Sequence, residues 1–247
     1  MTDDKMVTQR RVALVFGGSR GIGAAAASRL AADGFAVALT YVSRSDKARE
    51  VVEAIEASGG EALAIAADSA DPEAIRAAVA QTVERFGPID AIVVNAGIIH
   101  IAPIDSFPLE TLDRMLDVNV RGVFLAIQAA VPHMRDGGRI ITIGSNTAVR
   151  SSTPGSGVYA MTKAAVATMV KGAAVDLAPR RITVNNIQPG PTETDMTSAM
   201  VPYLIELSPM RRVGKPSEIA ALVSYLAGAD AGYMTGASLT IDGGFVL

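Results

Sequence analysis

The sequence predicts an α/β fold in which helices cover both faces of a doubly wound, parallel sheet of seven strands. Short apolar runs recur along the chain, and helix-length segments separate them. The early runs are apolar almost throughout, as expected for strands covered on both faces. Strands that alternate with helices indicate right-handed crossovers and therefore parallel pairing. The seven expected strands are Val12–Phe16, Ala36–Tyr41, Ala62–Ala66, Ala91–Val94, Ile140–Ile143, Ile182–Ile187 and Ser238–Ile241.

Turn-forming residues mark the helix boundaries between these runs. Asp33-Gly34 and Ser58-Gly59-Gly60 are expected to end two helices, because glycine readily adopts the conformation that closes a helix. Asp71-Pro72 is expected to open a third helix, since proline is tolerated in a first turn, and Gly87-Pro88 is expected to end it.

The chain contains no repeat, charge block or linker that would divide it, so we expect a single domain over residues 1–247. The one long irregular candidate runs from Pro189 to about Pro216. Segments of that length in compact domains are often lids. We therefore expect a substrate-binding lid over about 190–216.

Composition excludes several classes of function. The 247 residues are 49% hydrophobic and 19% charged, too apolar for a disordered chain, and the net charge of -3 favours neither nucleic acid nor an anionic membrane as a partner. The chain has no cysteine and two histidines, His100 and His133, which argues against thiolate, disulfide and zinc chemistry. The start, MTDDKMVTQRR, does not resemble a signal peptide, and no stretch approaches about 20 uninterrupted apolar residues. We expect a cytoplasmic protein with a small-molecule partner and no metal.

A glycine-rich loop, Gly17-Gly18-Ser19-Arg20-Gly21-Ile22-Gly23, directly follows the first expected strand, and an alanine-rich helical segment follows the loop. Glycines allow the backbone to approach a ligand closely, while free N–H groups at a helix start attract phosphate. The alternative for a lone glycine triad is a tight turn, but the strand before and the helix after it favour a nucleotide site. The spacing is G-x-x-x-G-x-G.

Tyr159-Ala160-Met161-Thr162-Lys163, together with the glycine loop, resembles the short-chain dehydrogenase/reductase family. The resemblance covers nearly the whole chain and is closest to its 3-oxoacyl-carrier-protein reductase-like and carbonyl reductase-like members. It implies a Rossmann-type sheet with strand order 3-2-1-4-5-6-7 and the cofactor at the carboxyl ends of the strands. Further matching motifs are Asn95-Ala96-Gly97, Asn119 within N-V-x-G, Pro189-Gly190 and Asp242-Gly243-Gly244.

Tyr159 and Lys163 provide a plausible proton donor for carbonyl reduction. A carbonyl that accepts hydride needs a proton, and a phenol with a pKa of about 10 is poorly matched to neutral pH. Lys163 follows four residues later on the same helical face, so we expect its ammonium to lower the pKa of Tyr159. In alcohol oxidation the phenolate becomes the base. Alone, this spacing also fits an amphipathic helical pair on a solvated face.

The resemblance assigns roles to a catalytic tetrad of Asn119, Ser145, Tyr159 and Lys163. It implies that Lys163 holds the ribose hydroxyls, that Ser145 hydrogen-bonds the substrate oxygen and that Asn119 supports a water-linked proton relay. Ser145 precedes Tyr159 by fourteen positions, whereas thirteen is commoner in the family. We choose Ser145 because it follows an apolar strand, whereas the alternatives occupy a Gly/Pro loop that is expected to shape substrate entry: Ser151, Ser152 and Ser156.

The end of the second expected strand favours NADPH over NADH. Thr40 stands where an NAD site normally has an acid, and Arg20 and Arg44 could bind a 2'-phosphate. In the alternative, Arg44 is a solvated loop residue and Asp46 serves NAD, although Asp46 fits a helix start better. Phe16 replaces the family's usual threonine before the glycine loop, which leaves the loop's hydrogen bonding open.

Asp68 and Ser69 resemble the family's adenine contacts, and the alternative for Asp68 is a helix cap. Including these two, the residues expected to bind NADP(H) are Gly17, Ser19, Arg20, Gly21, Ile22, Gly23, Tyr41, Ser43, Arg44, Asp68, Ser69, Asn95, Ala96, Gly97, Tyr159, Lys163, Pro189, Gly190, Thr192 and Thr194.

The sequence therefore predicts an NADPH-dependent carbonyl reductase or alcohol dehydrogenase. No arginine or lysine is obviously aimed at a substrate carboxylate, which favours neutral ketones, although Arg211 and Arg212 in the expected lid leave a 3-oxoacyl-carrier-protein substrate open. A regulatory member of the family that binds cyclic di-GMP is another alternative. Substrate-facing positions are expected at Ile98, Ile99, Asn146, Thr147, Thr153 and Thr192–Tyr203.

Two apolar helical segments, around Leu116–Val131 and Val158–Val175, look too hydrophobic to face water fully. They could belong to the core. The resemblance instead implies that they form a helix-bundle interface in a homotetramer.

Overall fold

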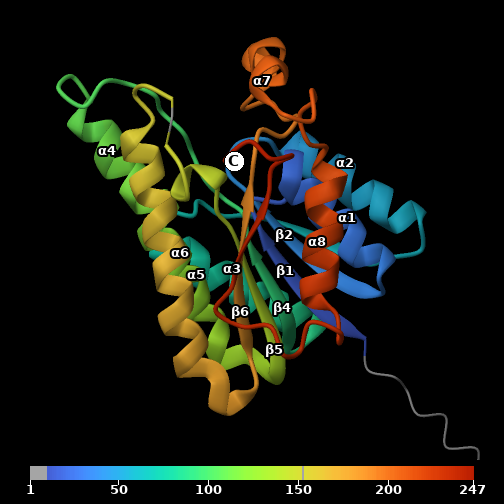
Figure 1. Cartoon of the computed structure of the whole chain (residues 1–247). Helices are drawn as coiled ribbons and strands as arrows, with labels where there is room; N and C mark the ends of the chain where they lie inside the picture. Colours follow the sequence, from blue (N-terminus) through green and yellow to red (C-terminus); the bar gives the residue numbers. More distant parts are fainter. Residues whose placement is uncertain (1–9, 152) are drawn as a thin grey trace, which may run out of the picture.

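The computed structural model describes residues 10–151 and 153–247. Its seven parallel strands lie in the order β3-β2-β1-β4-β5-β6-β7, which confirms the predicted fold class and strand order (Figure 1). The expectation that the start, MTDDKMVTQRR, is not a signal peptide concerns residues that lie mostly outside the described ranges. The strands are β1 (Arg11–Phe16), β2 (Phe35–Tyr41), β3 (Ala62–Ala66), β4 (Ile89–Val94), β5 (Met134–Ile143), β6 (Thr183–Pro189) and β7 (Ser238–Ile241).

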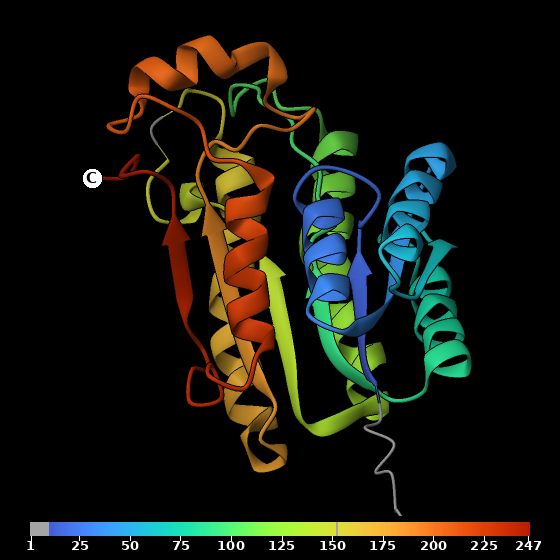
Figure 2. The ribbon, with the colours of Figure 1, turned by 90° about the vertical axis from the view of Figure 1, so that its right-hand side faces the viewer.

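Helices cover both faces of this sheet, as predicted. In Figure 2, α8 and α1 lie in front of the strands and α6 lies behind them. The two apolar layers are distinct: α1, α2 and α8 pack on one face, and α3, α5 and α6 pack on the other. The α-helices are α1 (Gly21–Ala32), α2 (Ser45–Ala57), α3 (Pro72–Phe86), α4 (Leu109–Leu116), α5 (Gly122–Ala130), α6 (Gly157–Leu177), α7 (Val201–Leu207) and α8 (Pro216–Ala227).

The helix boundaries predicted from turn-forming residues are all confirmed. Asp71 caps α3, because its side chain accepts a hydrogen bond from the Glu73 N–H at 2.9 Å, and Pro72 stands in the first turn. Gly34 and Gly87 have a φ of 90°, which glycine adopts without the steric cost that a side chain brings.

β5 begins six residues earlier than the apolar run that predicted it. Its first half, Met134–Arg139, contains two glycines and an aspartate, so it lacks the apolar pattern of a buried strand. The register with β4 shifts between Ile89 and Ala91, which accommodates this irregular half. A pattern search therefore recognises only the regular second half.

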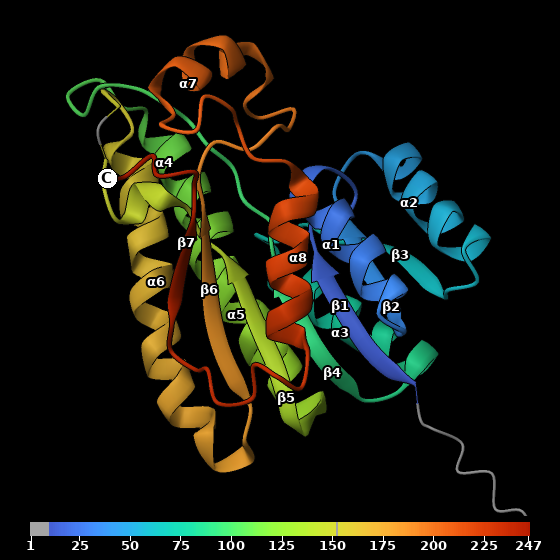
Figure 3. The ribbon, with the colours of Figure 1, turned by 45° about the vertical axis from the view of Figure 1, so that its right-hand side comes forward.

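The segment expected to be irregular from Pro189 to about Pro216 is partly ordered, which corrects that expectation. Pro189 completes β6, and the segment contains a short 3-10 helix, η5 (Ser198–Met200), followed by α7. A proline in the first turn of α7 is compatible with a helix, so turn composition alone is misleading here. In Figure 3, α7 lies above the carboxyl ends of the central strands.

One helical run, Leu109–His133, is long and apolar enough to cross a membrane by length and composition alone. The run is not continuously apolar, since charged residues such as Asp117 and Arg121 interrupt it. Val123 and Ile127 from this run belong to the apolar layer between the helices and the sheet.

Candidate active site

The glycine loop is held in shape by two residues outside it. The Gly17 N–H donates to the Thr40 hydroxyl at 2.9 Å, and the Asn95 side-chain amide donates to the Gly17 carbonyl at 2.7 Å. Thr40 thus supplies a hydroxyl contact to a loop in which Phe16 precedes the first glycine. The sequence indicated only that Thr40 is not an acid. Its role in holding the glycine loop could have been suspected from a hydroxyl residue at the end of an otherwise apolar strand.

Glycine is required in this loop for steric reasons. Gly17 has a φ of 75°, and a Cβ atom there would lie 2.9 Å from the Ala96 Cα. A Cβ atom on Gly23 would lie 2.1 Å from the Gly17 carbonyl oxygen. The loop therefore folds back closely on itself before α1. The Gly17 and Gly18 N–H groups are bonded to Thr40, so the N–H groups at the start of α1 are the ones that can bind a phosphate.

Three of the four predicted catalytic residues converge near the carboxyl ends of β4 and β5. Lys163 and Tyr159 come from α6, and the Lys163 Nζ lies 5.7 Å from the centre of the Tyr159 ring. This Nζ also donates to the Ile143 carbonyl, at the end of β5, at 3.0 Å. Ser145 follows two residues after that strand and hydrogen-bonds the Tyr159 phenol.

Asn119 lies in a π-helical turn, η1 (Asp117–Arg121), between α4 and α5. Its fully buried side chain accepts from the Ile98 N–H and donates to the Ile98 carbonyl, both at 2.8 Å. Gly97 lies between the two parts of the tetrad, since a Cβ there would lie 3.3 Å from the Lys163 Nζ and 3.4 Å from the Asn119 Oδ1. Asn119 therefore fixes the backbone beside Lys163, and the water relay stays a prediction.

The local electrostatics differ from the expectation that Lys163 lowers the pKa of Tyr159. Burial raises the pKa of the Tyr159 phenol to about 12, against a smaller lowering by the Ser145 hydrogen bond. Burial also lowers the pKa of the Lys163 ammonium to about 8. The expectation was wrong because desolvation disfavours the charged form of both groups.

Ser145 is favoured over the other candidate serines by its position. It is buried, caps the short 3-10 helix η3 (Asn146–Ala148) and accepts two hydrogen bonds from Thr147. Ser151 and Ser156 instead hydrogen-bond each other at 2.8 Å, and Ser156 also donates to the Thr153 carbonyl. Ser152 lies outside the described residues.

The two arginines expected at a 2'-phosphate both have carboxylate partners. Arg44 donates to both carboxylate oxygens of Asp46, at 3.0 and 2.9 Å, which holds the pKa of Asp46 well below its usual range. Arg20, the residue before α1, lies 3.2 Å from the carboxylate of Asp195 in the 190–216 segment. Asp46 lies in the first turn of α2, as expected for a helix-start residue.

Asp68 does not cap a helix. It accepts from the Ala70 N–H at 2.9 Å and from Arg114 at 2.8 Å, whereas Asp71 caps α3. Arg114 was not foreseen, because it lies on α4, 46 positions away in the chain. Ser69, the other expected adenine contact, is buried.

The 190–216 segment meets the glycine loop directly. A Cβ atom on Gly21 would lie 3.2 Å from the Thr194 methyl carbon, next to the Arg20–Asp195 pair. Thr192 donates to the Gly190 carbonyl at 2.9 Å, which stabilises the turn leaving β6. The remaining expected cofactor contacts lie in the elements already described: Ser19 precedes Arg20 in the loop, Ile22 lies in the first turn of α1, Tyr41 ends β2, and Ser43 precedes Arg44.

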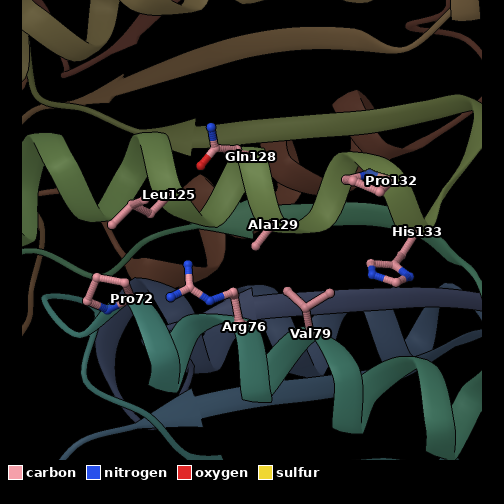
Figure 4. Close-up of a pocket in the computed structure, with 8 residues that line it drawn as sticks. All are labelled: Pro72, Arg76, Val79, Leu125, Gln128, Ala129, Pro132 and His133. Carbon is pink, nitrogen blue, oxygen red and sulfur yellow. The ribbon is translucent and has the colours of Figure 1, made fainter.

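A separate cavity of about 330 Å³ lies between α3 and α5 (Figure 4). It is lined by apolar side chains such as Val79 and Leu125 and by Arg76, Gln128 and His133. None of the predicted catalytic or cofactor residues lines it. His100 is not in it either, and its ring instead contacts Phe107, with centres 5.4 Å apart.

A glycine loop at the switch point of a parallel sheet, with a tyrosine, a lysine and a serine close by, defines a dinucleotide-binding enzyme of the Rossmann type. A family described as enoyl-(acyl carrier protein) reductase matches residues 17–246. The short-chain dehydrogenase/reductase of Serratia marcescens is 52% identical, with a TM-score of 0.94, over 97% of this chain and 99% of that one. The chain belongs to the short-chain dehydrogenase/reductase family.

Other relatives indicate the range of this family. Versicolorin reductase 1 of Aspergillus parasiticus is 40% identical over 95% of each chain. The cyclic-di-GMP-binding biofilm dispersal mediator protein of Escherichia coli is 39% identical over 95% of this chain and 97% of its own. A blue fluorescent protein from a metagenomic library, solved with NADPH, is 47% identical, with a TM-score of 0.93, over 96% of this chain and 98% of that one.

Proposed function

We propose that this protein is an NADPH-dependent carbonyl reductase, which transfers hydride to a ketone or aldehyde and oxidises the secondary alcohol in reverse. The observation that carries this proposal is the placement of the Tyr159 phenol beside Ser145 and Lys163, near the carboxyl ends of β4 and β5. The related versicolorin reductase, named for its reductase activity, supports the same class of reaction.

The chain's own residues supply the proton chemistry. With a pKa near 12, the Tyr159 phenol keeps its proton at neutral pH and can donate it to the developing alkoxide. Ser145 donates a hydrogen bond to the same oxygen. Lys163 would hold the ribose hydroxyls of the bound cofactor through its ammonium, and Asn119 fixes the neighbouring backbone at Ile98.

NADP(H) is the proposed cofactor, and it would supply the hydride when bound. The glycine loop and the start of α1 would hold its pyrophosphate, and Arg20 and Arg44 its 2'-phosphate. The metagenomic relative solved with NADPH supports this choice. Thr40 also fits it, because its hydroxyl is committed to Gly17 and no acid stands there to hold a free ribose.

Tyr159→Phe tests the mechanism. It should abolish NADPH oxidation with a panel of ketones and aldehydes, a loss of at least about 100-fold in kcat, because the proton donor is removed. NADPH binding should persist, as measured by fluorescence titration. The matched control is Tyr233→Phe, since Tyr233 is fully exposed and away from this site. Undiminished turnover in Tyr159→Phe would refute the proposed role.

Neutral ketones of substantial apolar surface are the proposed substrates, admitted beneath a lid formed by about 190–216. The exposed side chains Met196, Met200 and Tyr203 on this segment support a largely apolar entrance. Arg212 is less suited to an acyl-carrier-protein contact than its sequence position suggested, because both of its terminal nitrogens donate to Glu218 at 2.7 Å. A substrate screen with NADPH and NADH in parallel separates these possibilities.

Cyclic di-GMP binding is a second candidate function, supported by the name and 39% identity of the Escherichia coli relative. A pure binding protein has no need of a partly buried phenol that is hydrogen-bonded by a serine. Calorimetry with cyclic di-GMP, alongside the carbonyl panel, discriminates between the two functions, and absence of binding removes this candidate.

Assembly into a homotetramer in the cytoplasm completes the proposal. Phe124 on α5 and Met161 and Val175 on α6 are large apolar side chains that are about half or more exposed in the single chain. Such exposure is typical of a surface that a partner subunit covers.

A further inference from the structure

Ser145 has an unusual hydrogen-bonding environment. A serine hydroxyl carries one proton and two acceptor lone pairs. The Thr147 N–H donates to the Ser145 Oγ at 3.2 Å, and the Thr147 hydroxyl donates to the same atom at 2.9 Å. A single neighbouring residue therefore occupies both acceptor positions of Ser145.

The remaining capacity of Ser145 is its proton. With both acceptor positions occupied, Ser145 can take part in its hydrogen bond to the Tyr159 phenol only as the donor, and this bond lowers the pKa of the phenol. A hydroxyl that already accepts hydrogen bonds also becomes a better donor, because hydrogen bonds in a chain polarise one another. Hydrogen bonds are thus donated from Thr147 to Ser145 and from Ser145 to Tyr159.

We infer that Thr147 is a positioning residue that acts through Ser145, restricting it to donation so that its proton points at the Tyr159 oxygen and, in turnover, at the substrate carbonyl. This inference rests on the proposed carbonyl reduction. Without the Thr147 hydroxyl, Ser145 would regain an acceptor position and could hold the phenolic proton that the substrate oxygen needs.

The backbone around Ser145 has supports that do not depend on the Thr147 hydroxyl. The Gly144 N–H donates to the Ile187 carbonyl at 2.7 Å, and the Asn146 side chain donates to Asp242 at 3.3 Å. The Thr147 N–H itself also remains in any substitution except proline. A variant that lacks only the hydroxyl should therefore keep the turn at η3.

Thr147→Val and Thr147→Ser form a matched pair for the test, because valine keeps the shape of threonine while serine keeps its hydroxyl. In Thr147→Val the kcat for carbonyl reduction should fall about three- to tenfold, the effect of one neutral hydrogen bond. The dissociation constant for NADPH should be unchanged. Thr147→Ser should recover kcat to within about twofold of the unmodified protein.

Two readouts separate positioning from a structural effect. In Thr147→Val the pH at which alcohol oxidation reaches half its maximum should rise, because a phenol that donates to Ser145 is stabilised in its neutral form. The effect of Thr147→Val should also vanish when Ser145 is alanine, since the two residues then no longer interact.

Several results would overturn this inference while the proposed function stands. One is a Thr147→Val variant with unchanged kcat and an unshifted pH profile. Another is a Thr147→Ser variant whose kcat falls as far as that of Thr147→Val. The third is a Thr147→Val change that lowers kcat equally in the wild-type and Ser145→Ala proteins. If the wild-type protein fails to oxidise NADPH with every carbonyl compound of the panel, the proposed function is overturned, and this inference with it.

Discussion

At the scale of single residues, Thr40 shows how one side chain can take part in two aspects of a site. It stands at the end of β2, where an acid would favour NADH, and its hydroxyl accepts the Gly17 N–H. The side chain is 1% exposed, so water cannot replace this contact. Cofactor preference and loop shape are thus linked through one residue.

Replacing Thr40 by valine should destabilise the loop. The Gly17 N–H would lose its partner in a part-buried position, at a cost of about 1–3 kcal/mol in the free energy of unfolding. Thermal denaturation should show a lower Tm, and fluorescence titration should show a weaker affinity for NADPH. Thr40→Ser is the control because it keeps the hydroxyl, and equal behaviour of the two variants would contradict the assignment.

Lys163 makes stability depend on pH in a defined direction. Burial lowers its pKa from 10.5 to about 8, so between these values the unfolded chain binds a proton that the folded chain does not. The free energy of unfolding should therefore increase as pH rises from 8 to 10.5, by about 3 kcal/mol from this group alone.

The measurement is chemical denaturation across that pH range for the wild type and Lys163→Met. The wild type should become more stable relative to the variant as pH rises through this window. Lys171→Met, a change on the exposed side of the same helix, should leave the slope unaltered. Parallel slopes for wild type and Lys163→Met would refute a desolvated ammonium.

At the scale of elements, the 190–216 segment is tied to the start of α1. The Arg20–Asp195 pair joins two parts of the chain 175 positions apart, and Thr194 packs against Gly21. A 2'-phosphate that binds Arg20 has to compete with the Asp195 carboxylate. Cofactor binding and the position of the segment are therefore expected to be coupled.

Asp195→Asn should tighten NADPH binding by about two- to fivefold, the range expected for an exposed ion pair, with less effect on NADH. The difference should shrink in high salt, which screens exposed charges. Dissociation constants for both nucleotides at two salt concentrations provide the measurement. Asp136→Asn is the control, since Asp136 pairs with Arg180 at the other end of the sheet. Weaker NADPH binding in Asp195→Asn would contradict the competition.

At the scale of the whole molecule, the helices α5 and α6 combine core side chains with exposed apolar ones. The layer of α5 and α6 presents Phe124, Met161 and Val175 to solvent, although both helices also contribute to the core. Their apolar composition is therefore only partly explained by packing on the sheet. The remaining apolar surface is what the proposed tetramer would bury.

Val175→Lys should dissociate the proposed tetramer into smaller species. It places a charge at a side chain that is 74% exposed in the single chain and that the proposed interface would bury. Analytical ultracentrifugation should show a smaller species, with the Tm falling as assembly is lost. Val42→Lys, at an exposed position after β2, serves as the control. An unchanged sedimentation coefficient would place the interface elsewhere.

Local chemistry made much of this protein predictable from its sequence. Apolar runs located all seven strands, Asp71 and Gly87 located helix ends, and the motif around Tyr159 and Lys163 placed two reactive groups on one helix face. These features depend on residues a few positions apart, so their signal survives without knowledge of the fold. The first half of β5 and α7 were missed because their composition resembles a turn or an irregular segment.

The tertiary structure decided how distant residues complete the site and what charge they carry. The contacts of Thr40 with Gly17, Arg114 with Asp68 and Arg20 with Asp195 join segments that are remote in the chain. The raised pKa of Tyr159 arises from burial, which is a property of the packed molecule and not of a four-residue spacing. The sequence thus determined the fold and the kinds of groups in the site, whereas packing determined their partners and protonation, because both depend on distance and solvent access.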